Sequence, residues 1–196
     1  AKTYSCDITD LAANDKLAKD ILQDFGHVDV LVNNAGRSIR RSLALSYDRF
    51  HDFERTMQLN YFACVRLTMN LLPSMTARKS GHVINVSSIG VLTNAPRFSA
   101  YVASKAALES FARCAASEFH DEGVHFTIIN MPLVRTPMIA PTKIYADMPT
   151  VISPEEAADM IADAIIRRPQ RIATRLGVMA EIMHLLMPKL SEVVMN

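Results

Sequence analysis

Short apolar runs that alternate with longer amphipathic stretches constrain the fold of this chain more than any other feature of its sequence. Three runs are rich in β-branched residues and bounded by turn residues, as buried parallel strands are: Val28–Val32, His82–Val86 and Val124–Ile129. Three stretches with helical periodicity fill the intervals: Asp10–Phe25, about Asp48–Arg78 and Ser99–Phe119. Strands that alternate with helices of this length predict an α/β fold with a doubly wound parallel sheet.

The same pattern continues to the end of the chain. Ser153 and Pro154 predict the start of a further helix, because serine is a favoured N-cap and proline suits the first helical turn. A last short strand is predicted over Arg171–Thr174, and an apolar helix over Val178–Met187 that Pro188 closes. No internal repeat or linker divides the sequence, so we expect a single domain over residues 1–196.

The composition excludes several classes of protein. The 196 residues are 49% hydrophobic and 21% charged, and a net charge of +1 offers no broad field for capturing nucleic acid. No apolar run reaches the ~18 residues that a transmembrane helix needs. Three widely spaced cysteines favour free thiols and a reducing, cytoplasmic location. The six histidines show no metal-ligand spacing, so we expect no metal site.

Polar or small residues follow each of the first three predicted strands. Asn33-Asn34-Ala35-Gly36 comes after the first, Ser87-Ser88 after the second and Asn130-Met131-Pro132 after the third. Ligands of open parallel sheets bind outside the carboxyl ends of the strands, so these residues are candidates for a site. Each set also has an ordinary interpretation, because Asn, Gly, Ser and Pro are common in turns.

A tyrosine and a lysine lie four positions apart within the third predicted helix, as Tyr101 and Lys105. This spacing puts a phenol and an ammonium on one helical face. Ser88 precedes Tyr101 by thirteen positions, and Asn60 lies in the middle of the long helix before it. With Asn33-Asn34-Ala35-Gly36, these elements resemble the signature of the short-chain dehydrogenase/reductase family, whose fold is Rossmann-like. The resemblance runs over nearly the whole chain.

The resemblance implies a catalytic role for four residues: Asn60, Ser88, Tyr101 and Lys105. Tyr101 would exchange a proton with a carbonyl oxygen while a hydride passes between the carbonyl carbon and a nicotinamide. A free phenol has a pKa of about 10, and an ammonium ~4 Å away would lower it with up to about 4 kcal/mol of Coulomb energy. Lys105 would also bind the nicotinamide ribose, Ser88 would orient the carbonyl, and Asn60 would hold a water molecule beside Lys105.

The resemblance also implies a set of cofactor-binding residues: Asp7, Asn33, Ala35, Gly36, Tyr101, Lys105, Pro132, Val134 and Thr136. Asp7 would contact the adenine, and the turn from Asn33 to Gly36 would lie beside the adenosine ribose. Because Gly36 has no side chain, a ligand can approach its backbone closely. The Val134 backbone and the Thr136 hydroxyl would contact the carboxamide, in a segment where Leu133 replaces the glycine that the family usually has after proline.

One family feature is absent from residues 1–196: the glycine-rich loop that holds a pyrophosphate at a helix N-terminus. Lys2–Asp7 is typical of the end of a strand, so we expect that loop and the first strands of the domain to precede Ala1. On this interpretation the chain is truncated at its N-terminus, and residues 1–196 alone would bind cofactor weakly and be inactive. The residues that distinguish NADP from NAD would also lie upstream. NADPH is the expected cofactor, with NADH as the alternative.

The segment Met131–Lys143 and the motifs around Pro154 and Arg171 resemble the reductase domain of bacterial fatty acyl-coenzyme A reductases. This resemblance implies hydride transfer to a long-chain acyl thioester or aldehyde carbonyl, under an apolar lid formed by Met131–Met148. Two alternatives remain open. One is an alcohol dehydrogenase or ketoreductase that acts on another apolar substrate, and the other is a non-catalytic fragment of such an enzyme.

Two of the predicted helices carry more apolar positions than one sheet face can cover, including Phe62, Leu67, Phe111 and Phe119. Together with the family resemblance, this surplus predicts a homo-oligomer paired through the two long helices. The expected partners are therefore a second copy of the chain and a small-molecule substrate, either an apolar carbonyl compound or an acyl-CoA. Neither a nucleic acid nor a transmembrane segment is expected.

Overall fold

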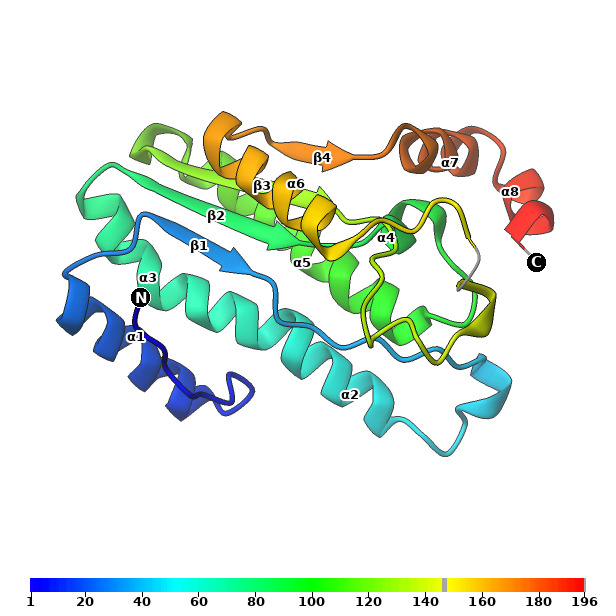
Figure 1. The fold of residues 1–196 in the computed structure, drawn as a ribbon, viewed down its shortest axis with the longest axis horizontal. Coiled ribbons are helices and arrows are strands. Elements are labelled where there is room, and N and C mark those ends of the chain that lie inside the picture. Colours follow the sequence, from blue (N-terminus) through cyan, green and yellow to red (C-terminus); the bar gives the residue numbers. More distant parts are fainter. Residues whose placement is uncertain (146–147, 196) are drawn as a thin grey trace.

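A computed structural model describes residues 1–145 and 148–195, and its centre is a sheet of four parallel strands (Figure 1). The strands are β1 (Val30–Asn33), β2 (Gly81–Val86), β3 (Val124–Asn130) and β4 (Arg171–Ala173), and they lie side by side in chain order. Each neighbouring pair is parallel. The predicted parallel α/β sheet is confirmed, and the four strands predicted from Val28 onward are found close to their expected positions.

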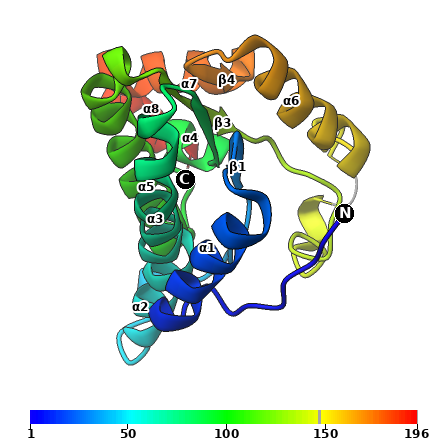
Figure 2. The same cartoon turned by 90° about the vertical axis from the view of Figure 1, so that its left-hand side faces the viewer.

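Helices connect the strands and cover both faces of the sheet (Figure 2). They are α1 (Leu11–Phe25), α2 (His51–Met57), α3 (Cys64–Ala77), α4 (Ile89–Thr93), α5 (Ser99–Glu118), α6 (Pro154–Arg167), α7 (Arg175–Leu186) and α8 (Pro188–Met195). Successive strand residues point to opposite faces. Leu31, Val83 and Phe126 therefore pack against α1, α3 and α5, whereas Ile84 and Ile129 pack against α6.

The long helix predicted over about residues 48–78 is divided into three parts. A π-helical segment, Gln58–Ala63, joins α2 to α3, and its wider winding shifts the side chains that follow. Pro73 lies inside α3 without ending it, because the helix continues to Ala77. Asn60 lies in the π-helical segment and is fully buried. Such segments are frequent at functional sites.

Residues 1–7 lie outside the sheet, so the prediction that Lys2–Asp7 ends a strand is wrong for the described structure. A strand requires a neighbouring strand that takes up its backbone N–H and C=O groups. This segment is instead attached to α1 by side chains, since Lys2 and Tyr4 both donate hydrogen bonds to Asp24.

The chain after β4 is helical to the end of the described residues. Thr174 caps α7, so this helix begins three residues before the predicted Val178, and α8 follows from Pro188. Gly177 of α7 lies against α4, where a Cβ atom would come within 2.9 Å of the Leu92 side chain. The tail helix therefore packs beside α4, a short helix that the sequence pattern did not predict.

We expect acid to destabilise the fold through His82, which is fully buried in β2 with its Nε2 2.9 Å from Thr127 Oγ1. Burial, and then the charges of Arg168 and His125, lower the pKa of His82 from 6.5 to about 4. The unfolded chain binds a proton near pH 6.5 and the folded chain only near pH 4. The free energy of unfolding should therefore fall as the pH drops through this window, by up to about 3 kcal/mol.

Urea unfolding at pH 7.0 and pH 4.5 measures this loss. His82→Gln provides the control, because its amide can still donate to Thr127 but does not titrate. If the variant loses as much stability between the two pH values as the wild-type protein, the acid sensitivity does not arise from His82.

Candidate active site

The residues predicted to carry chemistry gather at the carboxyl edge of the sheet, where β1, β2 and β3 all end (Figure 1). Asn33 is the last residue of β1 and Asn130 the last of β3, while Ser87 and Ser88 directly follow β2. Helix α5 contributes Tyr101 and Lys105 to the site. The geometry matches the general position of ligand sites in open parallel sheets.

Ser88 and Tyr101 meet at the start of α4. Ser88 is the N-cap of this helix, and its Oγ accepts a hydrogen bond of 3.0 Å from the backbone N–H of Gly90. The Ser88 side chain lies close enough to Tyr101 to lower the pKa of the phenol, and the tyrosine ring lies edge-on to Phe98 with the ring centroids 6.4 Å apart. A carbonyl oxygen that reaches Ser88 would therefore also reach the Tyr101 phenol.

The pKa of the Tyr101 phenol is raised above its ordinary value of 10.0, where the sequence led us to expect a lower one. Burial is the main cause, because it disfavours the phenolate, and the neighbouring Ser88 side chain acts in the opposite direction. The ammonium of Lys105 hydrogen-bonds a backbone carbonyl rather than the phenol. Tyr101 is consequently protonated at neutral pH, which is the form that can donate a proton.

Lys105 is almost completely buried, with 3% of its surface exposed. Its Nζ donates a hydrogen bond of 2.8 Å to the carbonyl oxygen of Val86, the last residue of β2. Burial lowers the pKa of Lys105, while the charges of Cys64 and Glu109 raise it. A Cβ atom on Gly36 would lie 3.3 Å from this Nζ, so a side chain there would crowd the ammonium and the space beside it.

Asn60 connects the turn after β1 to α5 through hydrogen bonds. Its Oδ1 accepts from the backbone N–H of Arg37 at 2.8 Å, and its Nδ2 donates to the Arg37 carbonyl at 2.9 Å and to Ser104 Oγ at 2.9 Å. The sequence predicted that Asn60 holds a water molecule beside Lys105. In the structure the amide holds the Gly36-Arg37 backbone next to Lys105, and the water molecule stays a prediction.

The turn after β1 offers a ligand its backbone rather than the side chain of Asn33. The Nδ2 of Asn33 donates to Thr68 Oγ1 at 3.1 Å and to Asn85 Oδ1 at 2.9 Å, so this amide is engaged inside the protein. Ala35 is exposed and Gly36 half-buried. The surface that Asn33, Ala35 and Gly36 can present to a ligand is therefore the backbone of Ala35 and Gly36.

Asp7 lies within electrostatic reach of this turn. Its Oδ1 accepts from the Thr9 backbone N–H at 2.9 Å and from the Thr9 hydroxyl at 2.7 Å. These hydrogen bonds, together with the charge of Arg37, hold the pKa of Asp7 below its ordinary value. Gln58 Nε2 donates to the Thr9 carbonyl at 3.0 Å, which attaches the Asp7 segment to the π-helical segment that carries Asn60.

The segment after β3 is fixed in an extended form. Val134 pairs with Ile152 in a parallel bridge, in which Ile152 donates to the Leu133 carbonyl and accepts from the Arg135 N–H, both at 2.9 Å. This pattern turns the Val134 backbone away from Ile152. Thr136 Oγ1 donates to the Val134 carbonyl at 3.3 Å, so the two predicted contacts lie together, two residues beyond the half-buried Pro132.

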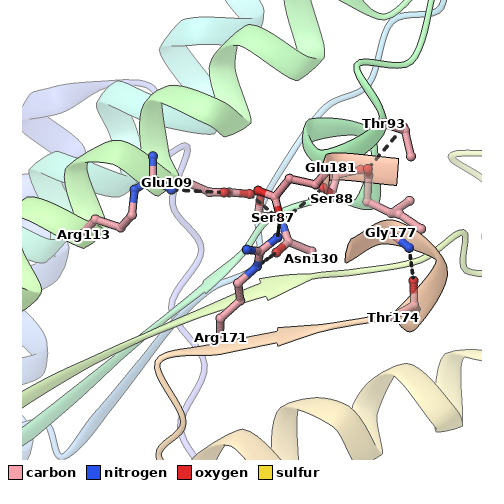
Figure 3. Close-up of polar contacts among 11 residues, drawn as sticks. Ser87, Ser88, Thr93, Glu109, Arg113, Asn130, Arg171, Thr174, Gly177 and Glu181 are labelled. Atoms are coloured by element: carbon pink, nitrogen blue, oxygen red, sulfur yellow. Dashed lines mark hydrogen bonds and ion pairs between the residues drawn. The ribbon is translucent and has the colours of Figure 1, made fainter. Parts of the chain in front are cut away.

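A buried polar network beneath Ser88 was missed at the level of sequence (Figure 3). Glu109, on α5, accepts hydrogen bonds from Ser87 Oγ and, at 2.6 Å, from Asn130 Nδ2. Asn130 Oδ1 accepts from Arg171 Nε at 2.8 Å, and Arg171 Nη2 binds Glu181 of α7 at 2.7 Å. The signal available in the sequence was an acidic residue four positions after Lys105, on the apolar face of the helix.

Within the described residues, no group of three or more His, Cys, Asp or Glu side chains is arranged to hold a metal ion. None of the helices in residues 1–145 and 148–195 is long and apolar enough to cross a membrane.

A parallel sheet with Ser88, Tyr101 and Lys105 at its carboxyl edge defines an oxidoreductase of the short-chain type. The chain belongs to the short chain dehydrogenase family, whose model matches residues 1–144. The predicted family and its Rossmann-like fold are therefore confirmed.

Several relatives are similar over most or all of this chain. A fatty acyl-CoA reductase of Acinetobacter baylyi is 59% identical over all of this chain and 66% of its own length. A fatty acyl-CoA reductase of Mycobacterium tuberculosis is 50% identical over 91% of this chain and 60% of its own length. Matched regions thus cover 60% and 66% of these relatives. A crystal structure of a short-chain dehydrogenase from Streptomyces avermitilis matches with a TM-score of 0.81 and 32% identity, over 98% of this chain and 78% of that one.

Proposed function

We propose that this protein is an NADPH-dependent reductase that transfers hydride to the carbonyl of a long-chain acyl thioester or aldehyde. The observation that carries the proposal is the half-buried, protonated Tyr101 phenol beside Ser88, with Lys105 one helical turn further on. The similarity to two proteins named fatty acyl-CoA reductase supports the substrate class. A shared fold alone would not support it, because one fold hosts many substrates.

The residues at the sheet edge fit the nicotinamide half of the cofactor. The exposed backbone of Ala35 and Gly36 leaves room that a Cβ atom on Gly36 would fill, and Lys105 Nζ borders this room. Lys105 would hold the ribose there, and the Val134 backbone and Thr136 hydroxyl would hold the carboxamide. When bound, NADPH supplies the hydride. We propose NADPH rather than NADH, and Asp7 as the contact for the adenine.

The side chains of Ser88 and Tyr101 would act on the carbonyl oxygen of the substrate. Ser88 Oγ and the Tyr101 phenol would both hydrogen-bond the carbonyl oxygen and stabilise the charge that develops on it. With an aldehyde, Tyr101 donates its proton to this oxygen and the product is an alcohol. With a thioester, the C–S bond breaks after hydride has added to the carbonyl carbon, and the thiolate leaves with an aldehyde as the product. Lys105 restores charge balance when Tyr101 loses its proton.

Two apolar surfaces near Ser88 support a preference for long chains. One is the predicted lid, Met131–Met148, in which Met131 is buried and Met138 is half exposed, and of which positions 146–147 lie outside the described residues. The other is α7, which packs on α4 through Gly177 and exposes Met179 and Ile182. Flexible methionine side chains suit an apolar chain of variable shape.

Reduction of C8, C12 and C16 acyl-CoA by the full-length protein with NADPH tests this proposal. Each methylene that becomes buried contributes up to about 0.8 kcal/mol, so kcat/KM should rise by up to about 10²-fold from C8 to C12. Aldehyde or alcohol must appear as the product. A flat profile with chain length, or reduction of ketones alone, would favour the alternative alcohol dehydrogenase or ketoreductase. Fluorescence titration with NADPH separates both enzymes from a non-catalytic protein, which would not bind it.

We also propose that the enzyme is a cytoplasmic homo-oligomer. The free thiols of Cys6, Cys64 and Cys114 suit a reducing compartment. Of the apolar residues expected at the interface, Phe62 is half exposed, while Leu67, Phe111 and Phe119 pack partly against the core. A groove of about 660 Å³ between α3 and α5 is lined mainly by apolar residues.

We expect the full-length protein to be at least a dimer at micromolar concentration, with α3 and α5 in the interface. Multi-angle light scattering measures the mass directly. Met69→Glu, which puts a charge at the half-exposed rim of the groove, should shift the mass toward the monomer. A wild-type monomer would contradict the proposed assembly.

A further inference from the structure

Glu109 is a buried carboxylate on the same face of α5 as Lys105. The two residues are four positions apart, and 4% of the surface of Glu109 and 3% of that of Lys105 is exposed. Removing a carboxylate from water is costly unless it is paired and hydrogen-bonded. Its contacts should therefore reveal what it contributes.

The contacts of Glu109 converge on the turn that carries Ser88 (Figure 3). Its Oε1 accepts from the hydroxyl of Ser87, the residue directly before Ser88, and from Asn130 Nδ2 at 2.6 Å. The same Asn130 Nδ2 lies 3.4 Å from the Ser88 carbonyl oxygen. Glu109 thus holds the turn directly through Ser87 and indirectly through Asn130.

The second oxygen of the Glu109 carboxylate faces the protein surface. Its Oε2 lies 3.4 Å from Nη1 of Arg113, whose side chain is 60% exposed. A pair at that distance and exposure contributes little compared with hydrogen bonds to a buried charged group. The bonds to Ser87 and Asn130 are therefore the stronger constraint on the carboxylate.

Glu109 also supplies negative charge to Lys105. Burial lowers the pKa of Lys105, and the two groups whose charge opposes this effect are Cys64, on α3, and Glu109, on α5. The Cys64 thiol is neutral at physiological pH, because burial raises its pKa. Among the described residues, Arg113 on its own helix also faces Glu109, and Arg171 of β4 reaches it through Asn130.

We propose that Glu109 is a positioning residue of the active site, which fixes Ser88 through Ser87 and Asn130 and supplies negative charge beside Lys105. It touches neither substrate nor cofactor. The inference rests on the proposed function only in the choice of substrate for the assay, because any carbonyl reduced with Ser88, Tyr101 and Lys105 would need the same support.

Glu109→Gln and Glu109→Asp in the full-length protein separate the two parts of this role. With acyl-CoA and NADPH, Glu109→Gln should lower kcat about 10-fold or more, with little change in the KM for acyl-CoA. Reduction needs the ammonium, so activity is lost as pH rises through the pKa of Lys105. Glu109→Gln should move this basic limb to lower pH, because it removes a negative charge that favours the ammonium. Glu109→Asp keeps the charge, so it should lower kcat without moving the limb.

Arg113→Gln is the matched control, because it removes the exposed partner of Glu109 and leaves Ser87 and Asn130 in place. It should change neither kcat nor the pH profile. If Arg113→Gln reproduces the profile of Glu109→Gln, the surface pair causes the effect and the proposal fails. An unmoved basic limb in Glu109→Gln would equally overturn the proposed support of Lys105.

Hydrogen exchange over residues 86–92 tests the support of Ser88 without turnover. The amides of Ser87 and Ile89 bond to the carbonyls of Ile129 and Met131. Exchange of these amides should be about 10-fold faster in Glu109→Gln and unchanged in Arg113→Gln. Unchanged exchange in Glu109→Gln would overturn the positioning role. If the wild-type protein reduces no acyl-CoA, the proposed substrate fails, while this measurement still decides the role of Glu109.

Discussion

Replacing Tyr101 with phenylalanine in the full-length protein is expected to lower kcat by about 10²-fold to 10⁴-fold, the range over which a positioned proton donor contributes. The phenol lies beside Ser88, and burial raises its pKa, so it is protonated at neutral pH. Phenylalanine retains the ring and its edge-on contact with Phe98, so the substitution removes the donor with little change in shape. NADPH should therefore bind with a Kd close to that of the wild-type protein, which fluorescence titration measures.

Tyr47→Phe is the matched control for this prediction. It removes the hydroxyl of a tyrosine that is 88% exposed and lies outside the proposed site, so kcat should not change. Near wild-type turnover by Tyr101→Phe would mean that another group delivers the proton. Tyr101 would then lose its assigned role.

The helices and strands that could be predicted are those that the local sequence pattern determines. β2 is apolar over most of its length because both of its faces are covered, and Ser153 with Pro154 marks the start of α6 because capping is a local event. The π-helical segment Gln58–Ala63 could not be predicted in this way. Its residues have ordinary helical patterning, and the segment forms where Asn60 reaches Arg37, 23 positions earlier in the chain.

The same distinction applies to the candidate site: its local features could be predicted, and those that depend on distant residues could not. Tyr101 and Lys105 are four positions apart, and in a helix this spacing places them on one face, so their common face could be derived from the sequence. The direction of the Tyr101 pKa could not, because a pairwise Coulomb argument leaves out burial, which is the largest cause here. Glu109 was missed for a related reason. A charged residue on an apolar helical face is explained only by its partners, Ser87 and Asn130, which come from other elements.

Lys105→Ala is expected to impair turnover and cofactor affinity together. The ammonium lies between the end of β2 and the turn after β1: it donates to the Val86 carbonyl at 2.8 Å and lies 3.3 Å from where a Gly36 Cβ would be. In that position it can hold the ribose and compensate the charge on Tyr101 once the proton has left. An ammonium ~4 Å from a phenolate is worth up to about 4 kcal/mol, so kcat should fall by up to about 10³-fold. The Kd for NADPH should rise as well.

Both quantities are needed, because Tyr101→Phe is expected to change only kcat, whereas Lys105→Ala should change kcat and Kd. Lys105→Met fills the space that alanine leaves and should behave like Lys105→Ala, since both remove the buried ammonium. Thermal unfolding of both variants reports how much of the loss is structural. Lys16→Ala, which removes a side chain that is 75% exposed, should have no effect on either constant. If Lys105→Met keeps the wild-type Kd, the ribose contact is wrong. If it also keeps the wild-type kcat, the phenolate does not depend on this ammonium, and the buried cation of α5 serves the fold alone.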